Sequence, residues 1–224
     1  MSDAPQPEMP STFRMILTLA LISMLSGVTI VAAYQVTKAP IAQNHREALE
    51  EVGVFRVLPG ASSTVRYRID DDGIHLIDDP VDDSANIYAG FDNGDFIGVA
   101  MEGSAGGYGG TVRILFGYDP DEQCVIGYHV LQSAETPGIG SKIRDDEDFL
   151  ANFECLELPL DDDRSGLAYD VRVVSPGSSE EPGEIDNITG ATVSVEAVAT
   201  AIQRSAERFL PAIVENLERI REGE

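Results

Sequence analysis

The sequence predicts an α+β domain that follows a single membrane-spanning helix. Three observations support this fold class: an uncharged apolar run over residues 15–36, a series of short apolar segments joined by turn residues over 65–131, and a long amphipathic segment over 193–220. The first is long enough to cross a bilayer, the second is typical of antiparallel strands, and the third is typical of a helix that covers a sheet. A chain of 224 residues has room for this anchor and one domain.

The apolar run at 15–36 consists mainly of Leu, Ile, Val, Met and Ala. At about 1.5 Å per residue it is long enough for a hydrocarbon core of about 30 Å. A cleavable signal peptide is the alternative, because Val31-Ala32-Ala33 resembles a cleavage site, but the run exceeds a normal apolar signal core. We therefore expect a retained helix after a short N-terminal segment, residues 1–14, and the flanking charges do not fix its orientation.

The charge of the chain argues against a nucleic-acid partner. The formal net charge is -24, and nucleic-acid binding depends on basic surfaces. The acidic clusters stand beside Gly, Pro or other turn residues, and none has the spaced acidic loop of a calcium hand, so we interpret them as solvated turns. These clusters are Asp70-Asp71-Asp72, Asp78-Asp79, Asp82-Asp83, Asp145-Asp146 and Asp161-Asp162-Asp163.

The cysteine and histidine residues do not form a recognisable metal motif. Cys124 and Cys155 are too few and too far apart for a zinc site or an iron–sulfur cluster, and the three His residues lack ligand spacing. The two thiols are either buried or joined in a disulfide, and the sequence leaves both alternatives open. We expect no metal.

After the anchor, apolar and charged residues alternate with helical spacing from Asn44 to Leu58 and stop at Pro59-Gly60, which predicts a juxtamembrane helix within 37–60. The main domain then spans 61–224. Its first part contains three pairs of strand-like segments, each joined by turn residues, which predicts an antiparallel sheet of hairpins. The pairs are 65–69 with 74–77, 87–91 with 96–101, and 111–118 with 124–131.

The second part of the domain is expected to add helices. Residues 145–153 predict a short helix and 169–174 a further strand. From 193 to 220, apolar residues recur at steps of three or four, so one stripe of a long helix can cover the sheet. We expect Pro211 to kink or interrupt that helix.

The stretch that precedes the long helix is Asp186-Asn187-Ile188-Thr189-Gly190-Ala191-Thr192. Gly190 permits an unusual φ and a close approach of backbone to ligand, and the first-turn N–H groups of a helix attract an anion. The stretch therefore predicts a phosphate site. An ordinary helix cap is the alternative, because Asp186 or Thr189 can accept from the same N–H groups.

The same seven residues are similar to the flavinylation motif of the FMN-binding domain family, Asp-x-x-Ser/Thr-Gly-Ala-Thr. Two further segments resemble that family in the expected order: Gly107-Tyr108-Gly109-Gly110, and Glu135-Thr136-Pro137-Gly138-Ile139-Gly140 with its continuation Ser141-Lys142-Ile143. Together with the anchor, they resemble the G subunit of Rnf-type ion-translocating electron transport complexes.

The resemblance implies that FMN is bound covalently, through a phosphoester to Thr192. A threonine hydroxyl is a poor nucleophile and no His or Lys of the motif activates it, so we expect a separate enzyme to attach the cofactor. The resemblance implies that this enzyme is a flavin transferase that uses FAD as the FMN donor. Asp186, which would repel a phosphate, is interpreted as a cap or as part of the transferase recognition sequence. The resemblance also implies a cytoplasmic N-terminus and an extracytoplasmic domain on the periplasmic side of the inner membrane.

The other residues of the three motifs are candidates for flavin contacts. Thr136 and nearby N–H groups are candidates for hydrogen bonds to the flavin ring, Lys142 for a charge near the phosphate or reduced flavin, and Tyr108 for packing against the ring. The complete set of expected cofactor-binding residues is Thr189, Gly190, Ala191, Glu135, Thr136, Gly138, Ile139, Gly140, Lys142 and Tyr108.

The expected function is electron transfer within a membrane-bound complex that links ferredoxin and NAD, and not a stand-alone enzyme activity. The chain has neither nucleotide nor iron–sulfur motifs, so those groups belong to partner subunits. The C subunit of a sodium-translocating NADH:quinone oxidoreductase is a close alternative, although the chain length and the Gly-Ser-Lys-Ile continuation favour the Rnf type. An anchored domain that binds an anion or a partner without redox chemistry is a third interpretation.

Overall fold

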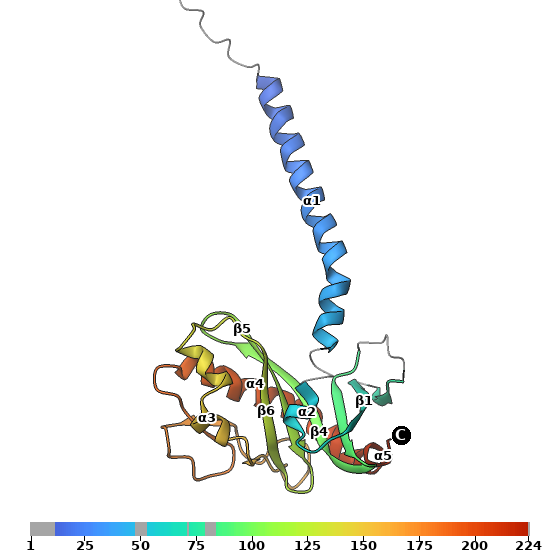
Figure 1. The fold of residues 1–224 in the computed structure, drawn as a ribbon, viewed down its shortest axis with the longest axis vertical. Coiled ribbons are helices and arrows are strands. Elements are labelled where there is room, and N and C mark those ends of the chain that lie inside the picture. Colours follow the sequence, from blue (N-terminus) through green and yellow to red (C-terminus); the bar gives the residue numbers. More distant parts are fainter. Residues whose placement is uncertain (1–11, 48–52, 71, 79–83, 224) are drawn as a thin grey trace, which may run out of the picture. The chain divides into compact units, whose positions relative to one another are not determined.

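The computed structural model describes residues 12–47, 53–70, 72–78 and 84–223, with the backbone alone for 38–47. The chain divides into two compact units, residues 1–46 and 47–224, which are described separately. Helix α1 (Thr12–Glu47) accounts for the described part of the first unit, and all other described elements belong to the second (Figure 1).

Helix α1 contains the predicted membrane span. Its segment Thr12–Thr37 has the length and apolar composition needed to cross a bilayer, and its large apolar side chains are exposed. Of the predicted juxtamembrane helix at Asn44–Leu58, the first residues are the end of α1 and residues 48–52 lie outside the described residues. Helix α2 (Val54–Val57) ends just before Pro59-Gly60.

A seven-stranded sheet forms the centre of the second unit, in the order β2-β1-β3-β4-β5-β6-β7, with every neighbouring pair antiparallel. The three predicted hairpins are confirmed as β1–β2, β3–β4 and β5–β6. Between β3 and β4, Asn93 and Gly94 both have positive φ, as the Asn-Gly pair predicts. The strands are β1 (Ser63–Asp70), β2 (Gly73–Leu76), β3 (Ile87–Asp92), β4 (Asp95–Gly106), β5 (Thr111–Asp119), β6 (Cys124–Gln132) and β7 (Leu156–Glu157).

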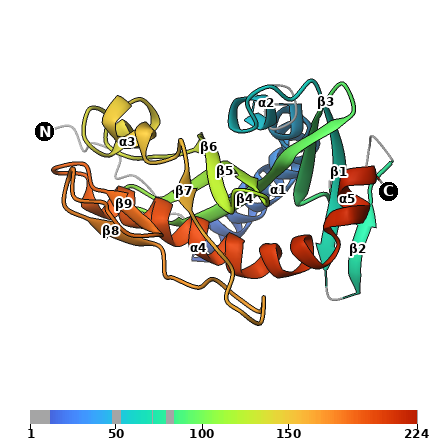
Figure 2. The ribbon, with the colours of Figure 1, turned by 90° about the horizontal axis from the view of Figure 1, so that it is seen from below.

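Helix α4 (Thr192–Glu215) covers one face of this sheet (Figure 2). It lies very close to β4, because a Cβ placed on Gly103 would be 2.5 Å from the carbonyl oxygen of Ala201. The helix continues through Pro211 and ends at Glu215, and Asn216 separates it from α5 (Leu217–Glu222). The predicted interruption at Pro211 is therefore wrong. Burial of the neighbouring residues 209, 210 and 213 against the sheet offsets the backbone hydrogen bond that proline removes.

Helix α2 lies on the opposite face of the sheet (Figure 2). Its residues Val54 and Val57, with Leu58, are fully buried in a second apolar cluster. A Cβ on Gly117 or Gly127 would lie 1.9 or 2.3 Å from the carbonyl oxygen of Val57. These two glycines leave a flat surface on β5 and β6 that admits the backbone of α2. The first described element after α1 is thus fixed to the sheet.

The remaining elements surround the N-terminal end of α4. They are η2 (Gly140–Arg144), α3 (Glu147–Ala151), and the parallel strands β8 (Arg172–Val174) and β9 (Glu184–Asp186). Asp146 caps α3 by accepting from the N–H of Phe149 at 3.1 Å, so the predicted helix at 145–153 is confirmed in a shorter form. The strand predicted at 169–174 is confirmed over its last three residues. Cys124 and Cys155 form a disulfide, which decides between the two alternatives left by the sequence.

The contact between α2 and the sheet gives a first prediction. We expect Gly117→Ala to destabilise the protein by about 1–3 kcal/mol, because the added methyl group cannot fit beside the carbonyl of Val57. Gly106→Ala is the matched control on a neighbouring strand, since a Cβ there meets no atom within 4 Å. Thermal unfolding of the detergent-purified chain measures both variants, and equal melting temperatures would show that α2 does not need the glycine.

Candidate functional site

A hollow of about 530 Å³ lies at the N-terminal end of α4. Three segments that are far apart in the sequence line it: the turn between β4 and β5, the loop that follows β6, and the start of α4. The lining residues are Tyr108, Glu135, Thr136, Ile139, Gly140, Gly190, Ala191, Thr192, Val193 and Ser194. The structure therefore brings together the three motifs that the sequence predicted to act at one site.

The carboxylate of Glu135 links the three motifs. Glu135 is only 7% exposed. Its Oε1 accepts from the N–H of Gly109 at 2.9 Å, and its Oε2 accepts from the hydroxyl of Ser194, itself 2% exposed. A buried carboxylate is stable only where such donors replace water, so these bonds fix the positions of the turn, the loop and the helix relative to one another.

Ser194 was not among the residues predicted from the sequence. It stands on the buried stripe of α4, at helical spacing from Val198 and Ala201. A polar residue on an apolar stripe was the available signal, but its partner at position 135 could not be read from the sequence. Glu135 was expected to contact the flavin, and in the structure both carboxylate oxygens bond to the protein.

Several glycines of the motifs leave room for this carboxylate. A Cβ on Gly107 would lie 2.4 Å from Oε1 of Glu135, and a Cβ on Gly140 would lie 2.6 Å from Oε2 and 2.5 Å from Oγ of Ser194. Gly109 is also confined, because its Cβ would lie 2.2 Å from the carbonyl oxygen of Ala134. The glycines therefore permit close packing at the centre of the site.

The turn before α4 has the backbone geometry that its glycine predicts. Gly190 has a φ of 85°, and the N–H of Ala191 donates to the carbonyl oxygen of Ile188 at 2.9 Å. Ala191 is the N-cap, and no side chain in the described part of the chain accepts from the first-turn N–H groups. The alternative that Asp186 or Thr189 caps this helix is therefore wrong. Asp186 instead accepts from the N–H groups of Ser178 and Ser179, and so orders the preceding loop.

The Thr192 hydroxyl has a neighbour in its own motif. Its Oγ accepts from the side-chain amide of Asn187 at 2.9 Å. Thr189 and Lys142 do not line the same hollow. They line a different one of about 460 Å³, together with Asp146, Asp186 and Asn187 among others. Gly138 lines neither of these hollows, and its φ of 75° serves the tight 136–141 loop.

The carboxylate of Glu184 on β9 stabilises the loop that precedes the Asp186–Thr192 motif. The N–H groups of Glu180 and Glu181, with the guanidinium of Arg172, lower the pKa of Glu184 to about 2. Arg172 also pairs with Glu181. Glu184 therefore stays ionised, and the loop is anchored, at any ordinary pH. On β6, burial and the charges of Arg56 and Arg144 lower the pKa of His129.

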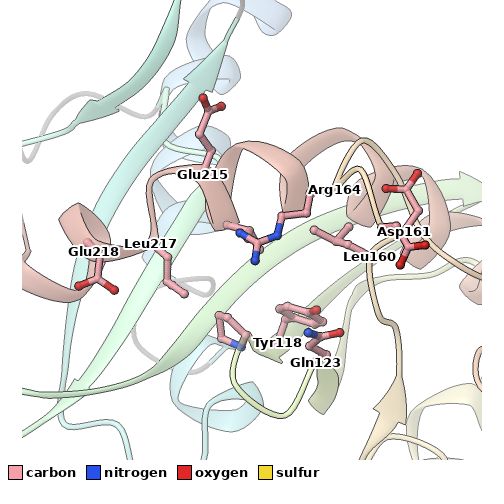
Figure 3. A pocket seen from close by; sticks show the side chains of 11 residues that line it. Tyr118, Gln123, Leu160, Asp161, Arg164, Glu215, Leu217 and Glu218 are labelled. Carbon is pink, nitrogen blue, oxygen red and sulfur yellow. The ribbon is translucent and has the colours of Figure 1, made fainter.

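Another hollow, of about 510 Å³, lies at the other end of α4 (Figure 3). Its labelled side chains come from the β5–β6 region, the 160–164 loop and the junction of α4 with α5. At about 1.5 Å per residue, Val214 in this hollow lies about 33 Å along α4 from Thr192. None of the predicted site residues lines it, so the candidate site is the hollow at the N-terminus of α4. Among the described residues, no group of His, Cys, Asp and Glu could hold a metal.

Comparison with protein families matches residues 107–207 to the FMN-binding domain. This range begins at the β4–β5 turn and includes the loop after β6 and the start of α4, which are the three linings of the hollow. Residues 107–207 of the chain therefore form an FMN-binding domain. The matched range includes the three segments that Glu135 joins.

Relatives of this chain are named as subunits of ion-translocating complexes. The chain is 27% identical over 202 residues to the G subunit of the ion-translocating oxidoreductase complex of Methanosarcina acetivorans, covering 87% of this chain and 92% of the relative. The G subunit of the same complex of Cereibacter sphaeroides is 29% identical over 194 residues, covering 86% and 82%.

Two solved structures have a similar fold. The NqrC of Shewanella oneidensis has a TM-score of 0.52 at 21% identity, over 77% of this chain and 76% of that one. The C subunit of the Na(+)-translocating NADH-quinone reductase of Parabacteroides distasonis has a TM-score of 0.53 at 16% identity, over 78% and 94%. These similarities confirm the predicted fold class of the FMN-binding domain.

The bonds of Glu135 give a second prediction. We expect Glu135→Ala to lower the free energy of unfolding by about 2–4 kcal/mol, because Gly109 N–H and the Ser194 hydroxyl lose their acceptor. Glu135→Gln is the control, since its amide can accept from Gly109 and donate to Ser194. Urea unfolding of the purified chain checks both, and an equal loss in the two variants would contradict the assignment.

Proposed function

We propose that this chain is the electron-transfer subunit of a membrane-bound, ion-translocating oxidoreductase of the Rnf type, and that it carries FMN through a phosphoester to Thr192. The observation that carries the proposal is the position of the Thr192 hydroxyl. It lines a hollow at the uncapped N-terminus of a long helix, inside a domain that matches the FMN-binding family.

The residues of this hollow fit FMN in two ways. First-turn N–H groups without a side-chain acceptor, at the positive end of a 24-residue helix, favour a phosphate. Around them are apolar side chains that the protein leaves uncovered: Tyr108 is 77% exposed, Ile139 52% and Val193 47%. A flat aromatic ring attached at Thr192 would cover such side chains. Thr136 and Gly140 line the same hollow, and the Thr136 hydroxyl and the backbone of Gly140 are the candidate polar contacts of the ring.

FMN would supply the redox chemistry, and the chain would supply position and attachment. A phosphoester bond keeps the cofactor on a protein whose site is open to solvent and to its partners. Electrons would pass through the flavin, and the chain needs no substrate pocket of its own.

Attachment of FMN requires a second protein. Among the residues that line the hollow, Glu135 is the one with a carboxylate, and its two oxygens already accept hydrogen bonds. The Thr192 hydroxyl therefore lacks an activating group of its own. A flavin transferase would supply the base and the FMN donor FAD, and Asp186 with its ordered loop would form part of the surface it recognises.

The proposed topology has a cytoplasmic N-terminus at 1–14, a membrane span at 15–36, a juxtamembrane segment at 37–60 and an extracytoplasmic domain at 61–224, in the inner membrane. The disulfide between Cys124 and Cys155 supports this orientation, because disulfides persist in oxidising compartments outside the cytoplasm. Membrane subunits and iron–sulfur subunits would be the redox partners. A relative in Acetobacterium woodii is named as the G subunit of a Na(+)-translocating ferredoxin:NAD(+) oxidoreductase complex, which supports this view.

The assignment of Thr192 gives a third prediction. We expect Thr192→Ala to abolish covalent flavin without changing the fold, because its side chain lies on the surface of the hollow. Thr189→Ala should keep the modification, since residue 189 lines a different hollow. Each variant is produced in a cell that contains the flavin transferase, and in-gel fluorescence with intact mass measures the attached FMN. Unmodified wild-type protein from such cells would contradict the redox function itself.

The orientation gives a fourth prediction. Alkaline phosphatase fused after residue 224 should be active, since it matures only outside the cytoplasm, and the same enzyme fused before residue 1 should be inactive. The reverse result would place the disulfide-bonded domain in the cytoplasm.

A further inference from the structure

The side chain of Asn187 is held against the proposed acceptor. Its Nδ2 donates to Oγ of Thr192 at 2.9 Å, and its backbone N–H donates to the carbonyl oxygen of Val174 on β8 at 3.0 Å. The tight turn at Gly190, where Ala191 N–H donates to Ile188, shortens the path between positions 187 and 192. The amide thus reaches the first turn of α4 from a backbone fixed at β8.

The direction of this bond leaves the hydroxyl free to react. Asn187 donates and Thr192 accepts, so one lone pair of Oγ is occupied, while the other lone pair and the hydroxyl proton remain available. Because threonine is β-branched, its side chain has few rotamers, and one hydrogen bond is enough to select among them. Thr189 has no such partner among the described residues, although it stands in the same motif.

The oxygen of the same amide is not hydrogen-bonded. Asn187 Oδ1 is buried and has no hydrogen-bond partner among the residues that the structure describes. A buried acceptor without a donor lowers stability, so folding alone does not account for an asparagine at this position. The contact with Thr192 is the one side-chain hydrogen bond that the described residues give to Asn187. This points to a function for the amide at the acceptor oxygen.

We propose that Asn187 is a positioning residue for the transfer of FMN to Thr192, and that its amide donates to the ester phosphate once the bond has formed. The inference rests on the proposed function. In the step, Oγ of Thr192 forms a bond to the FMN phosphorus of FAD, the phosphoanhydride bond breaks, and AMP leaves with the electron pair. The hydroxyl proton passes to a base of the transferase. No group is oxidised or reduced.

The position of Asn187 between two hollows suits it to hold the phosphate that is attached to Thr192. Asn187 lines the hollow that also contains Lys142, and Thr192 lines the hollow with the exposed apolar side chains. The hydrogen bond between Asn187 and Thr192 therefore connects the walls of the two hollows. The phosphoester would form where the two hollows meet. An N–H donor at 2.9 Å from the bridging oxygen is also within reach of the phosphate oxygens attached to it.

The test measures the kinetics of flavin attachment on the full chain. Unmodified wild type, Asn187→Ala and Asn187→Asp are purified in detergent from cells without the transferase. They are then incubated with purified transferase, FAD and Mg²⁺. In-gel fluorescence gives initial rates at several concentrations of the chain. Asn216→Ala is the matched control, because that amide donates to the Ala212 carbonyl at the far end of α4.

We expect Asn187→Ala to lower kcat about tenfold, the factor that corresponds to one lost hydrogen bond, with KM for the chain unchanged. Asn187→Asp should lose more, because a carboxylate cannot donate and repels the phosphate. Asn216→Ala should match wild type. A merely structural role would instead lower the melting temperature and leave kcat of the folded fraction unchanged.

The inference would be overturned if a folded Asn187→Ala chain had the same kcat as wild type. If that variant does not fold, the same kcat in the nearly isosteric Asn187→Asp variant would overturn it. Either result leaves the proposed function intact as long as wild type accepts FMN. A wild-type chain that accepts no FMN would instead reject the proposed function.

Discussion

The site depends on a buried carboxylate whose two oxygens hold two different parts of the chain. Glu135 accepts from the backbone of the β4–β5 turn and from the first turn of α4, and it stands itself in the loop after β6. An ionised group in this position is unfavourable unless its donors are in place, so the same two bonds that satisfy the charge also assemble the site. The glycines around it have no side chains because the carboxylate and its donors occupy that space.

Helices pack closely on both faces of the sheet that supports the site. On one face α4 lies against β4 closely enough that Gly103 admits no Cβ, which fixes the height of the helix N-terminus above the strands. On the other face α2 lies against Gly117 and Gly127. The proposed acceptor therefore stands at the start of a long helix whose buried residues extend from Ser194 to Ile213.

The sequence predicted most of the fold because the fold uses local signals. Alternating apolar residues and Asn-Gly or Asp-rich turns identified the hairpins, and the apolar stripe identified the covering helix. The predicted interruption of the helix at Pro211 was wrong, because burial of the neighbouring side chains outweighs a local preference there.

For the site, the motifs located the right segments but not the contacts within them. Glycine-rich turns and the Thr-Gly-Ala-Thr stretch could be recognised by type, and the hollow brings them together. The pairing of Glu135 with Ser194 and of Asn187 with Thr192 depends on how distant or looped segments meet in space, which no spacing rule records. The separation of Lys142 and Thr189 into another hollow has the same origin.

The packing of α2 also determines where the chain can be shortened. A soluble version that began at residue 61 would lack Val54, Val57 and Leu58, and would leave Tyr88, Ala100 and Leu115 without their cover. An uncovered apolar trough of this kind on a sheet attracts other copies of the same molecule. A shortened chain should therefore start before Val54, so that α2 still covers Gly117 and Gly127 on the sheet. The domain without its membrane helix should then stay monomeric.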